Sequence, residues 1–164
     1  SPAGLQCVLL PEADGTANAL RERLRTRCAA LPEVAAARQP AAVAAAIDAI
    51  RALLAGELLD LRDIVLDESR LSDFHRRVYA IARRIAPGQV RTYGDIALEL
   101  GDRQLARAVG QALGANPFAP VVPCHRVMGA QGWQGGFSAP GGVALKLRML
   151  AIEGAWPGGQ GLLF

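Results

Sequence analysis

The segment that most restricts the fold is GANPFAPVVPCHRV, residues 114–127, in which a proline recurs at every third position before a cysteine. Proline holds its own φ at about −65°, has no amide hydrogen to donate, and disfavours the helical conformation in the preceding residue. The stretch from Pro117 to Pro123 therefore cannot be a helix. We expect a rigid, extended arm that delivers Cys124 to a fixed place.

Cys124 is followed directly by His125 and Arg126, which leaves three interpretations open: a nucleophile, a metal ligand or a small apolar residue. A cysteine reacts as the thiolate, which nearby positive charge and hydrogen-bond donors stabilise. Arg126 can supply a positive field, Asn116 can fix the turn through side-chain hydrogen bonds, and His125 can act as a base. Adjacent side chains rarely point the same way, so a contact between Cys124 and His125 would run through water. Glu153, in MLAIEGA, is the best downstream carboxylate to orient the imidazole.

The other two cysteines, Cys7 and Cys28, are interpreted as small, partly buried side chains. Three cysteines without a Cys-x-x-Cys pattern, and only two histidines, argue against a disulfide framework and a zinc cluster. We therefore expect no metal, no cofactor and a reducing, cytoplasmic setting. No apolar run approaches the roughly 20 residues of a membrane span, so no membrane segment is expected.

The net charge of +3 over 164 residues is divided unevenly along the chain. Residues 1–70 contain eight Arg against ten Asp and Glu, a net −2, whereas residues 71–164 contain ten Arg and Lys against five acids, a net +5. The second part is therefore the one that would approach a polyanion. Excess positive charge is common on protein surfaces, so this observation alone identifies no partner.

The first 70 residues predict a small α/β region, and the remainder predicts a mostly helical domain. Residues 4–11 and 61–67 have the composition of short strands, and two Ala- and Arg-rich helices are expected over about 16–30 and 41–55. One or two strands make a poor sheet, so this region is short for an independent domain. We expect an α+β fold: an amino-terminal sheet-and-helix region over 1–70, then a helical domain over 71–164 with a helix-turn-helix and a cysteine-bearing loop.

The helix-turn-helix is predicted from capping residues between residues 72 and 113. Ser72 can cap a first helix whose apolar residues recur at helical spacing and which ends at the Pro-Gly pair 87–88. Thr92 and Asp95 resemble a capping box, which starts another helix that Gly101 ends. Asp102 can then cap the helix after it, from about 103 to 113. Two short helices joined by a tight glycine turn form a helix-turn-helix.

The second helix of this pair has one apolar face and one slim, basic face. Its apolar residues are Leu105, Val109 and Leu113. The opposite face carries Arg103, Arg107, Gly110, Gln111 and Gly114. A slim face with arginines suits close approach to a narrow groove of DNA, where an arginine can also enter a base step. An Ala-rich packing helix with two solvated arginines fits this stretch equally well.

These motifs together resemble a known family. PCHRV at 123–127, preceded by GANP at 114–117, resembles the active-site signature of the O6-alkylguanine-DNA alkyltransferases, also called methylated-DNA–protein-cysteine methyltransferases. The resemblance continues over TYGDIA, ARAVGQAL and LAIEG, and so covers roughly residues 72–154. PCHR alone could occur by chance, but the helix-turn-helix before it and the carboxylate after it make the match specific.

The resemblance implies a monomer that binds the minor groove of duplex DNA bearing O6-alkylguanine through the second helix. Arg107 matches the arginine that fills the stack when the damaged guanine is flipped out, as it must be because its target atom is inaccessible in the duplex. The residues expected to contact DNA are Arg107, Arg103, Gly110, Gln111, Gly114, Arg126 and Thr92.

The family chemistry implies that Cys124 attacks the alkyl carbon on guanine O6 and keeps the group as a thioether, so each molecule acts once. Thymine O4 is a further candidate position. His125 would take the thiol proton through water, Glu153 would orient His125, and Asn116 would hold the turn. Tyr93 matches the tyrosine that donates to guanine N3 as the leaving base gains charge. The backbone carbonyls of Cys124 and Val127 would read the exocyclic amine.

The loop after the cysteine departs from the family pattern. Trp133 stands at the usual tyrosine position and Gln134 at a small one, before Gly135, and FSAPGG is a longer link into the next helix. In the family this loop, with Val127, forms one wall of the pocket that holds the alkyl group. The resemblance therefore does not predict which sizes of alkyl group this protein accepts. The first region is also shorter than the family's amino-terminal sheet, so its early strands are expected to be missing.

Two other functions remain as alternatives. Alkyltransferase-like proteins bind alkylated bases without transfer, but they carry another residue, often Trp, where this chain has Cys124. An unrelated cysteine hydrolase would need a better-placed base and an oxyanion hole, and it would turn over.

Overall fold

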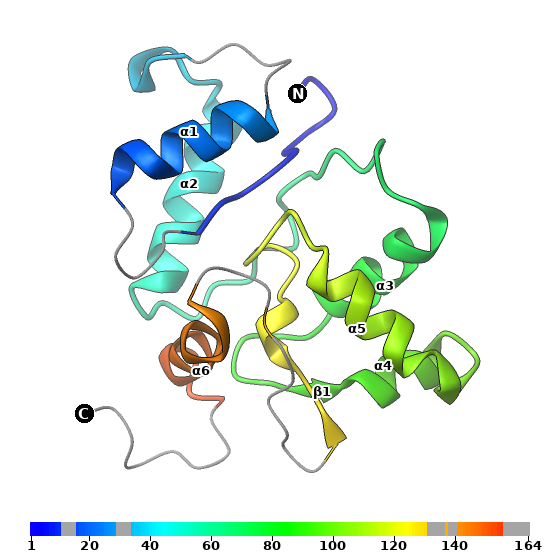
Figure 1. Ribbon diagram of the computed structural model, residues 1–164. Coiled ribbons are helices and arrows are strands. Elements are labelled where there is room, and N and C mark those ends of the chain that lie inside the picture. The colour runs from blue at the N-terminus through cyan, green and yellow to red at the C-terminus, as the bar shows by residue number, and fades with distance from the viewer. Residues whose placement is uncertain (11–15, 29–33, 131–136, 138–140, 156–164) are drawn as a thin grey trace.

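The structure is a computed structural model that describes residues 1–10, 16–28, 34–130, 137 and 141–155. Figure 1 shows helices α1 and α2 to one side of α3, α4 and α5. The helices are α1 (Ala17–Arg27), α2 (Ala41–Leu54), α3 (Asp73–Arg83), α4 (Tyr93–Glu99), α5 (Ala106–Gly114) and α6 (Gly142–Ile152). Three 3-10 turns, η1 (Ala36–Arg38), η2 (Arg103–Leu105) and η3 (Cys124–Arg126), and strands β1 (Arg91–Thr92) and β2 (Val127–Met128) complete the described elements.

The amino-terminal region contains the two expected helices but less strand than predicted. The expected strands over 4–11 and 61–67 meet only in an isolated parallel bridge between Leu5 and Leu66. In this bridge the Leu5 amide donates to the Val65 carbonyl, and the Leu5 carbonyl accepts from the Asp67 amide. The amide of Val8, three residues after Leu5, donates instead to the carbonyl of Pro117 at 2.8 Å. The first segment thus packs on the cysteine-bearing part of the chain. The α+β class is confirmed, but the paired strands lie elsewhere.

The sheet consists of β1 and β2, which pair in parallel with Arg91 opposite Val127 and Thr92 opposite Met128. Tyr93 follows β1 directly as the first residue of α4, and β2 directly follows η3, which begins with Cys124. Two segments about 35 residues apart in the chain are thereby brought together. Tyr93 lies close enough to Cys124 for the charge of a thiolate there to raise the pKa of Tyr93.

The helix-turn-helix is confirmed, with the capping residues that the sequence indicates. Thr92 Oγ1 accepts from the Asp95 amide at 3.1 Å, and an Asp95 carboxylate oxygen accepts from the Thr92 amide at 2.8 Å, which completes a capping box. Gly101 has a φ of +108°, which a residue with a side chain rarely adopts, and so makes the turn. The second helix begins as the 3-10 turn η2, capped by Asp102, and continues as α5.

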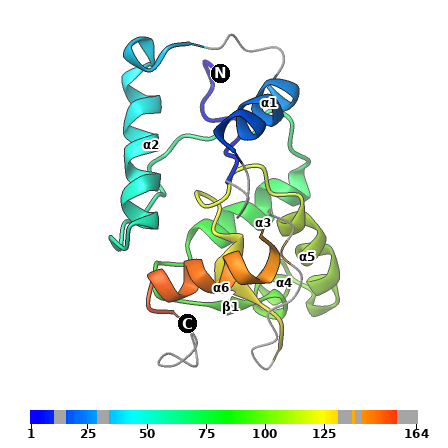
Figure 2. The ribbon, with the colours of Figure 1, turned by 60° about the vertical axis from the view of Figure 1, so that its left-hand side comes forward.

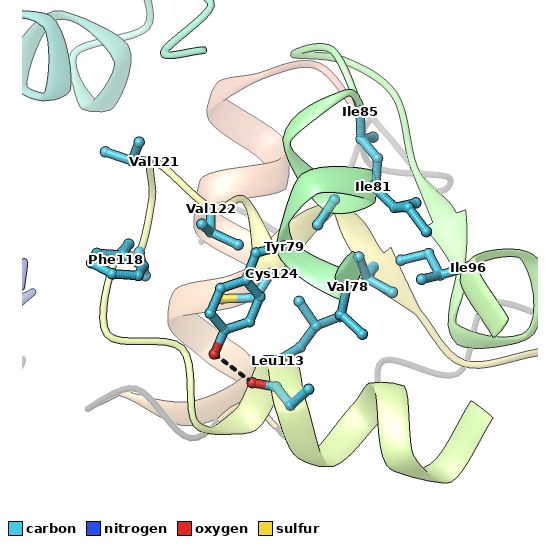
Figure 3. Close-up of a cluster of buried hydrophobic side chains, with 14 of the residues drawn as sticks. Val78, Tyr79, Ile81, Ile85, Ile96, Leu113, Phe118, Val121, Val122 and Cys124 are labelled. Carbon is cyan, nitrogen blue, oxygen red and sulfur yellow. Dashed lines mark hydrogen bonds between the residues drawn. The ribbon is translucent and has the colours of Figure 1, made fainter. Parts of the chain in front are cut away.

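The core lies between α3, α5 and the proline segment (Figure 3). Tyr79 of α3 is fully buried, and its hydroxyl donates to the carbonyl of Ala112 in α5 at 2.8 Å. Phe118 packs edge-on to the Tyr79 ring, with ring centroids 6.3 Å apart. The second helix of the pair is therefore fixed to the same core that holds the cysteine.

The segment from Pro117 to Pro123 is not helical, as expected, but it is not an extended arm. It folds into successive turns, in which the Val122 amide donates to the Phe118 carbonyl at 3.1 Å. Residues 118–123 are all buried. Apolar burial on the core favours this compact path over an extended one. Among the described residues, no helix is both long and apolar enough to cross a membrane.

Candidate active site

Cys124 is sheltered from bulk solvent but borders a cavity. Its side chain is 7% exposed and belongs to the core cluster, near Tyr79 and Val122 (Figure 3). The cavity, of about 120 Å³, is also lined by Leu113 and Gly114 at the end of α5. The nucleophile predicted from the sequence therefore lies at the base of the helix expected to face DNA.

Asn116 fixes the turn, as predicted, and it also contacts the sulfur, which the sequence motifs did not predict. Its side-chain nitrogen donates to the Val122 carbonyl at 2.8 Å and to Cys124 Sγ at 3.2 Å. Its side-chain oxygen accepts from the Phe118 amide at 2.9 Å. One amide side chain thus closes the loop over residues 116–124 and supplies a hydrogen-bond donor to the thiol.

The thiol of Cys124 is held mainly in its protonated form. Burial raises its pKa, because a thiolate loses hydration there, while the Asn116 hydrogen bond and the charge of Lys146 act in the opposite direction. Burial prevails, so the thiol must give up its proton as part of any reaction. A base near the sulfur is therefore a chemical requirement of this site.

His125 is fully buried, and its Nε2 lies 2.9 Å from Glu153 Oε1. Burial lowers the pKa of His125, and the neighbouring Glu153 offsets only part of that effect, so the imidazole is neutral and able to accept a proton. Its Nδ1 has no hydrogen-bond partner among the described residues. The predicted pairing of His125 with Glu153 is present, and the second ring nitrogen remains available for a proton.

Arg126 is buried, so the prediction that it contacts DNA is wrong. The residue is 4% exposed, and its Nε and Nη2 donate to the two carboxylate oxygens of Glu153 at 2.8 and 2.7 Å. Its Nη1 donates to the Ile85 carbonyl at 2.7 Å. Burial raises the pKa of Glu153, but hydrogen bonds from His125 and Arg126 lower it more strongly, to about 2. Arg126 therefore keeps Glu153 ionised for His125.

The charge of Lys146, in α6, lowers the pKa of Cys124. The sequence motifs do not indicate this residue. It is fully buried, its Nζ donates to the Val127 carbonyl at 2.6 Å, and it lies 5.8 Å from the centre of the Tyr93 ring. Burial lowers its pKa to about 8, although the nearby Cys124 raises it. A sequence signal existed: Lys146 is the one lysine among 18 basic residues.

Tyr93 lies against both α5 and α6. A Cβ added to Gly110 would meet Cδ1 and Cε1 of the Tyr93 ring at 3.9 Å, an ordinary contact distance. Burial raises the pKa of Tyr93, so its hydroxyl is a neutral hydrogen-bond donor. Val127 is fully buried, and Lys146 occupies one side of its carbonyl.

Most of the remaining predicted DNA-binding residues are exposed. Arg103, Arg107, Gln111 and Gly114 are exposed, and Gly110 is half-buried. Thr92 uses its hydroxyl to cap α4. Trp133, Gln134 and Gly135 lie outside the described residues. In the part of the chain that is described, no three Cys, His, Asp or Glu side chains are grouped as metal ligands.

Comparison with known proteins gives a consistent result. The family model "6-O-methylguanine DNA methyltransferase, DNA binding domain" matches residues 73–155. A methylated-DNA–protein-cysteine methyltransferase of Mycolicibacterium paratuberculosis is 47% identical over 114 residues, which cover 70% of this chain and 67% of the relative. A DNA base-flipping protein of Thermus thermophilus is 44% identical over 108 residues, which cover 66% and 71% of the two chains.

Among solved structures, Mycobacterium tuberculosis OGT in complex with DNA is 42% identical to this chain. The similarity has a TM-score of 0.61 and covers 68% of this chain and 67% of that one. Residues 73–155, which the family model matches, include the helix-turn-helix, Cys124, Lys146 and Glu153. The chain therefore belongs to the 6-O-methylguanine DNA methyltransferase family.

Proposed function

We propose that this protein repairs DNA by direct reversal, transferring an alkyl group from guanine O6 to its own Cys124. The observation that carries the proposal is a thiol bound by Asn116 and set in a cavity at the end of α5. In the reaction, a bond forms between Cys124 Sγ and the alkyl carbon while the bond from that carbon to O6 breaks. The thioether that results is stable, so each chain acts once.

Proton transfer in this reaction is assigned to the buried network. His125 accepts the thiol proton through a water molecule, since its Nε2 already pairs with Glu153 and its Nδ1 is unbonded among the described residues. Glu153, kept ionised by Arg126, stabilises the imidazolium that forms. Tyr93 donates to the departing guanine, which gains negative charge as the carbon–oxygen bond breaks.

DNA binding is assigned to the exposed face of α5, against the minor groove. The packing of this protein does not require Gly110 to be glycine, because the space for a Cβ is open apart from an ordinary contact with Tyr93. Close approach of another molecule is the reason that remains for a glycine in mid-helix, where it lowers stability. Arg107, exposed one turn before, is placed to occupy the base stack when the nucleotide is everted.

We propose further that the protein acts as a monomer in the cytoplasm, with residues 71–164 sufficient for chemistry and 1–70 in support. The three cysteines are free thiols, which fits a reducing compartment. The alternative function is lesion binding without transfer, and similarity to a DNA base-flipping protein gives it a basis. The thiol–Asn116 contact favours transfer, because binding alone needs no nucleophile.

The test is a duplex whose O6-methylguanine carries a labelled methyl group. We expect label on the protein at no more than one group per chain, at Cys124 by peptide mass, and none on the Cys124→Ser variant. Multiple turnovers would indicate a hydrolase. Tight binding of the lesion without label would indicate the binding function.

A further inference from the structure

Helix α1 carries four arginines and places them on two faces. Arg21 and Arg25 are exposed, and Arg25 forms an ion pair with Glu22 at 2.5 Å. Arg23 and Arg27, one turn apart, instead line the cavity that contains Cys124. None of the residues of α1 is buried, so neither of these arginines is enclosed in the core.

The cavity joins α1 to the site described above. Its wall includes Val8 and Leu10 of the first segment, Leu113 and Gly114 of α5, and the Asn116 and Cys124 pair. None of the described residues that line it is acidic. Arg27, which is exposed, also borders a second cavity of about 510 Å³ with Arg70 and His75. That second cavity also contains Asp67, whereas the charged residues described in the wall of the Cys124 cavity are the two arginines, Arg23 and Arg27.

We propose that Arg23 and Arg27 bind backbone phosphates of the DNA strand whose base enters the Cys124 cavity. This inference rests on the proposed function. An everted nucleotide brings its own flanking phosphates to the mouth of the pocket that receives the base. A guanidinium binds a phosphate through two parallel hydrogen bonds, and such contacts fix position rather than sequence. Helix α1, which lies above α3 and α5 in Figure 2, thus adds a second DNA contact to that of α5.

The experiment compares two double variants that remove the same charge from the same helix. Arg23→Ala/Arg27→Ala removes the arginines that line the cavity, and Arg21→Ala/Arg25→Ala removes those on the other face. Alanine suits a helix at all four positions. The binding constant for an O6-methylguanine duplex is measured by fluorescence anisotropy between about 50 and 200 mM salt, a range over which phosphate contacts weaken steeply.

Each lost phosphate contact reduces the slope of log K against log salt by about 0.9. In Arg23→Ala/Arg27→Ala we expect the magnitude of the slope to fall by about 2. Raising the salt from about 50 to 200 mM should then weaken binding by a factor roughly ten times smaller than in the wild type. The slope should stay near the wild-type value in Arg21→Ala/Arg25→Ala and in Arg23→Lys/Arg27→Lys, which keeps the charge. The ratio of transfer rates from duplex and from free alkylated guanine should fall only in the first variant.

Equal slopes and equal rate ratios in the two alanine variants would overturn the inference. So would a loss in Arg23→Lys/Arg27→Lys as large as that in the alanine variant, since that result would point to packing rather than charge. A wild-type protein that neither binds the duplex nor accepts label would instead refute the proposed function. The two failures are therefore distinguishable.

Discussion

Replacing Glu153 by Gln should destabilise the protein by about 3 kcal/mol at neutral pH. The carboxylate is 4% exposed and receives His125 and both Arg126 donors. These contacts lower the Glu153 pKa from 4.5 to about 2, and each tenfold change in proton affinity is worth about 1.4 kcal/mol. Removal of one partner from a buried ion pair costs about 3–5 kcal/mol in general, because the other charge stays buried.

The pH dependence gives this prediction its sign. A carboxyl group whose folded pKa is depressed stabilises the protein fully above its unfolded pKa, 4.5 here, and this contribution fades as pH falls towards 2. The part of the difference between wild type and Glu153→Gln that comes from the carboxylate should therefore be constant above about pH 5 and shrink below it. The lowered pKa of His125 adds a separate loss of stability as pH falls below 6.5.

The assay is urea unfolding followed by circular dichroism at several pH values, with Glu99→Gln as the control. Glu99 also contacts two arginines, Arg84 and Arg91, but at the surface, where such pairs are worth about 0–1 kcal/mol. We expect Glu99→Gln to cost less than 1 kcal/mol. The reasoning is refuted if the two substitutions cost the same, or if the Glu153→Gln deficit persists unchanged at pH 3.

Four further predictions follow from the same site. Lys146→Met should raise the unfolding free energy at pH 7 by about 1 kcal/mol in urea, because removal of a buried ammonium, worth about 3 kcal/mol, outweighs the lost bond to the Val127 carbonyl, worth about 2. Alkyl transfer should slow, because the Cys124 thiolate loses a stabilising charge; a faster transfer rate would contradict this. Tyr79→Phe should cost about 1 kcal/mol of unfolding free energy through loss of the bond to the Ala112 carbonyl; a stability equal to wild type would show that bond to be unimportant. Gly110→Ala should raise stability by about 0.5–1 kcal/mol yet weaken duplex binding by anisotropy; unchanged binding would remove α5 from the groove. Arg107→Ala should reduce repair of duplex far more than reaction with free alkylated base, and equal losses in both label-transfer assays would exclude a role in flipping.

The local parts of the structure could be predicted because neighbouring residues decide them. Ser72, Thr92 and Asp102 cap their helices with side chains that bond within three residues, and Gly101 adopts a φ that other residues avoid. The role of Asn116 in fixing its turn could be predicted for the same reason, because its side chain bonds to Phe118 and Val122. By contrast, the strands expected in the first region shrank to one bridge, since strand pairing depends on partners far away in the chain.

The sequence by itself determined which chemical groups the protein has: a thiol after three prolines, a helix-turn-helix with a slim basic face, and a carboxylate near the end of the domain. Only the tertiary structure decided what two of the cations do. Arg126, two positions after Cys124 in the chain, binds Glu153, whereas Lys146, 22 positions after Cys124, lies near the sulfur. The physical reason is that burial of a charge is tolerated only where a partner from another segment meets it, and a linear pattern does not contain that pairing.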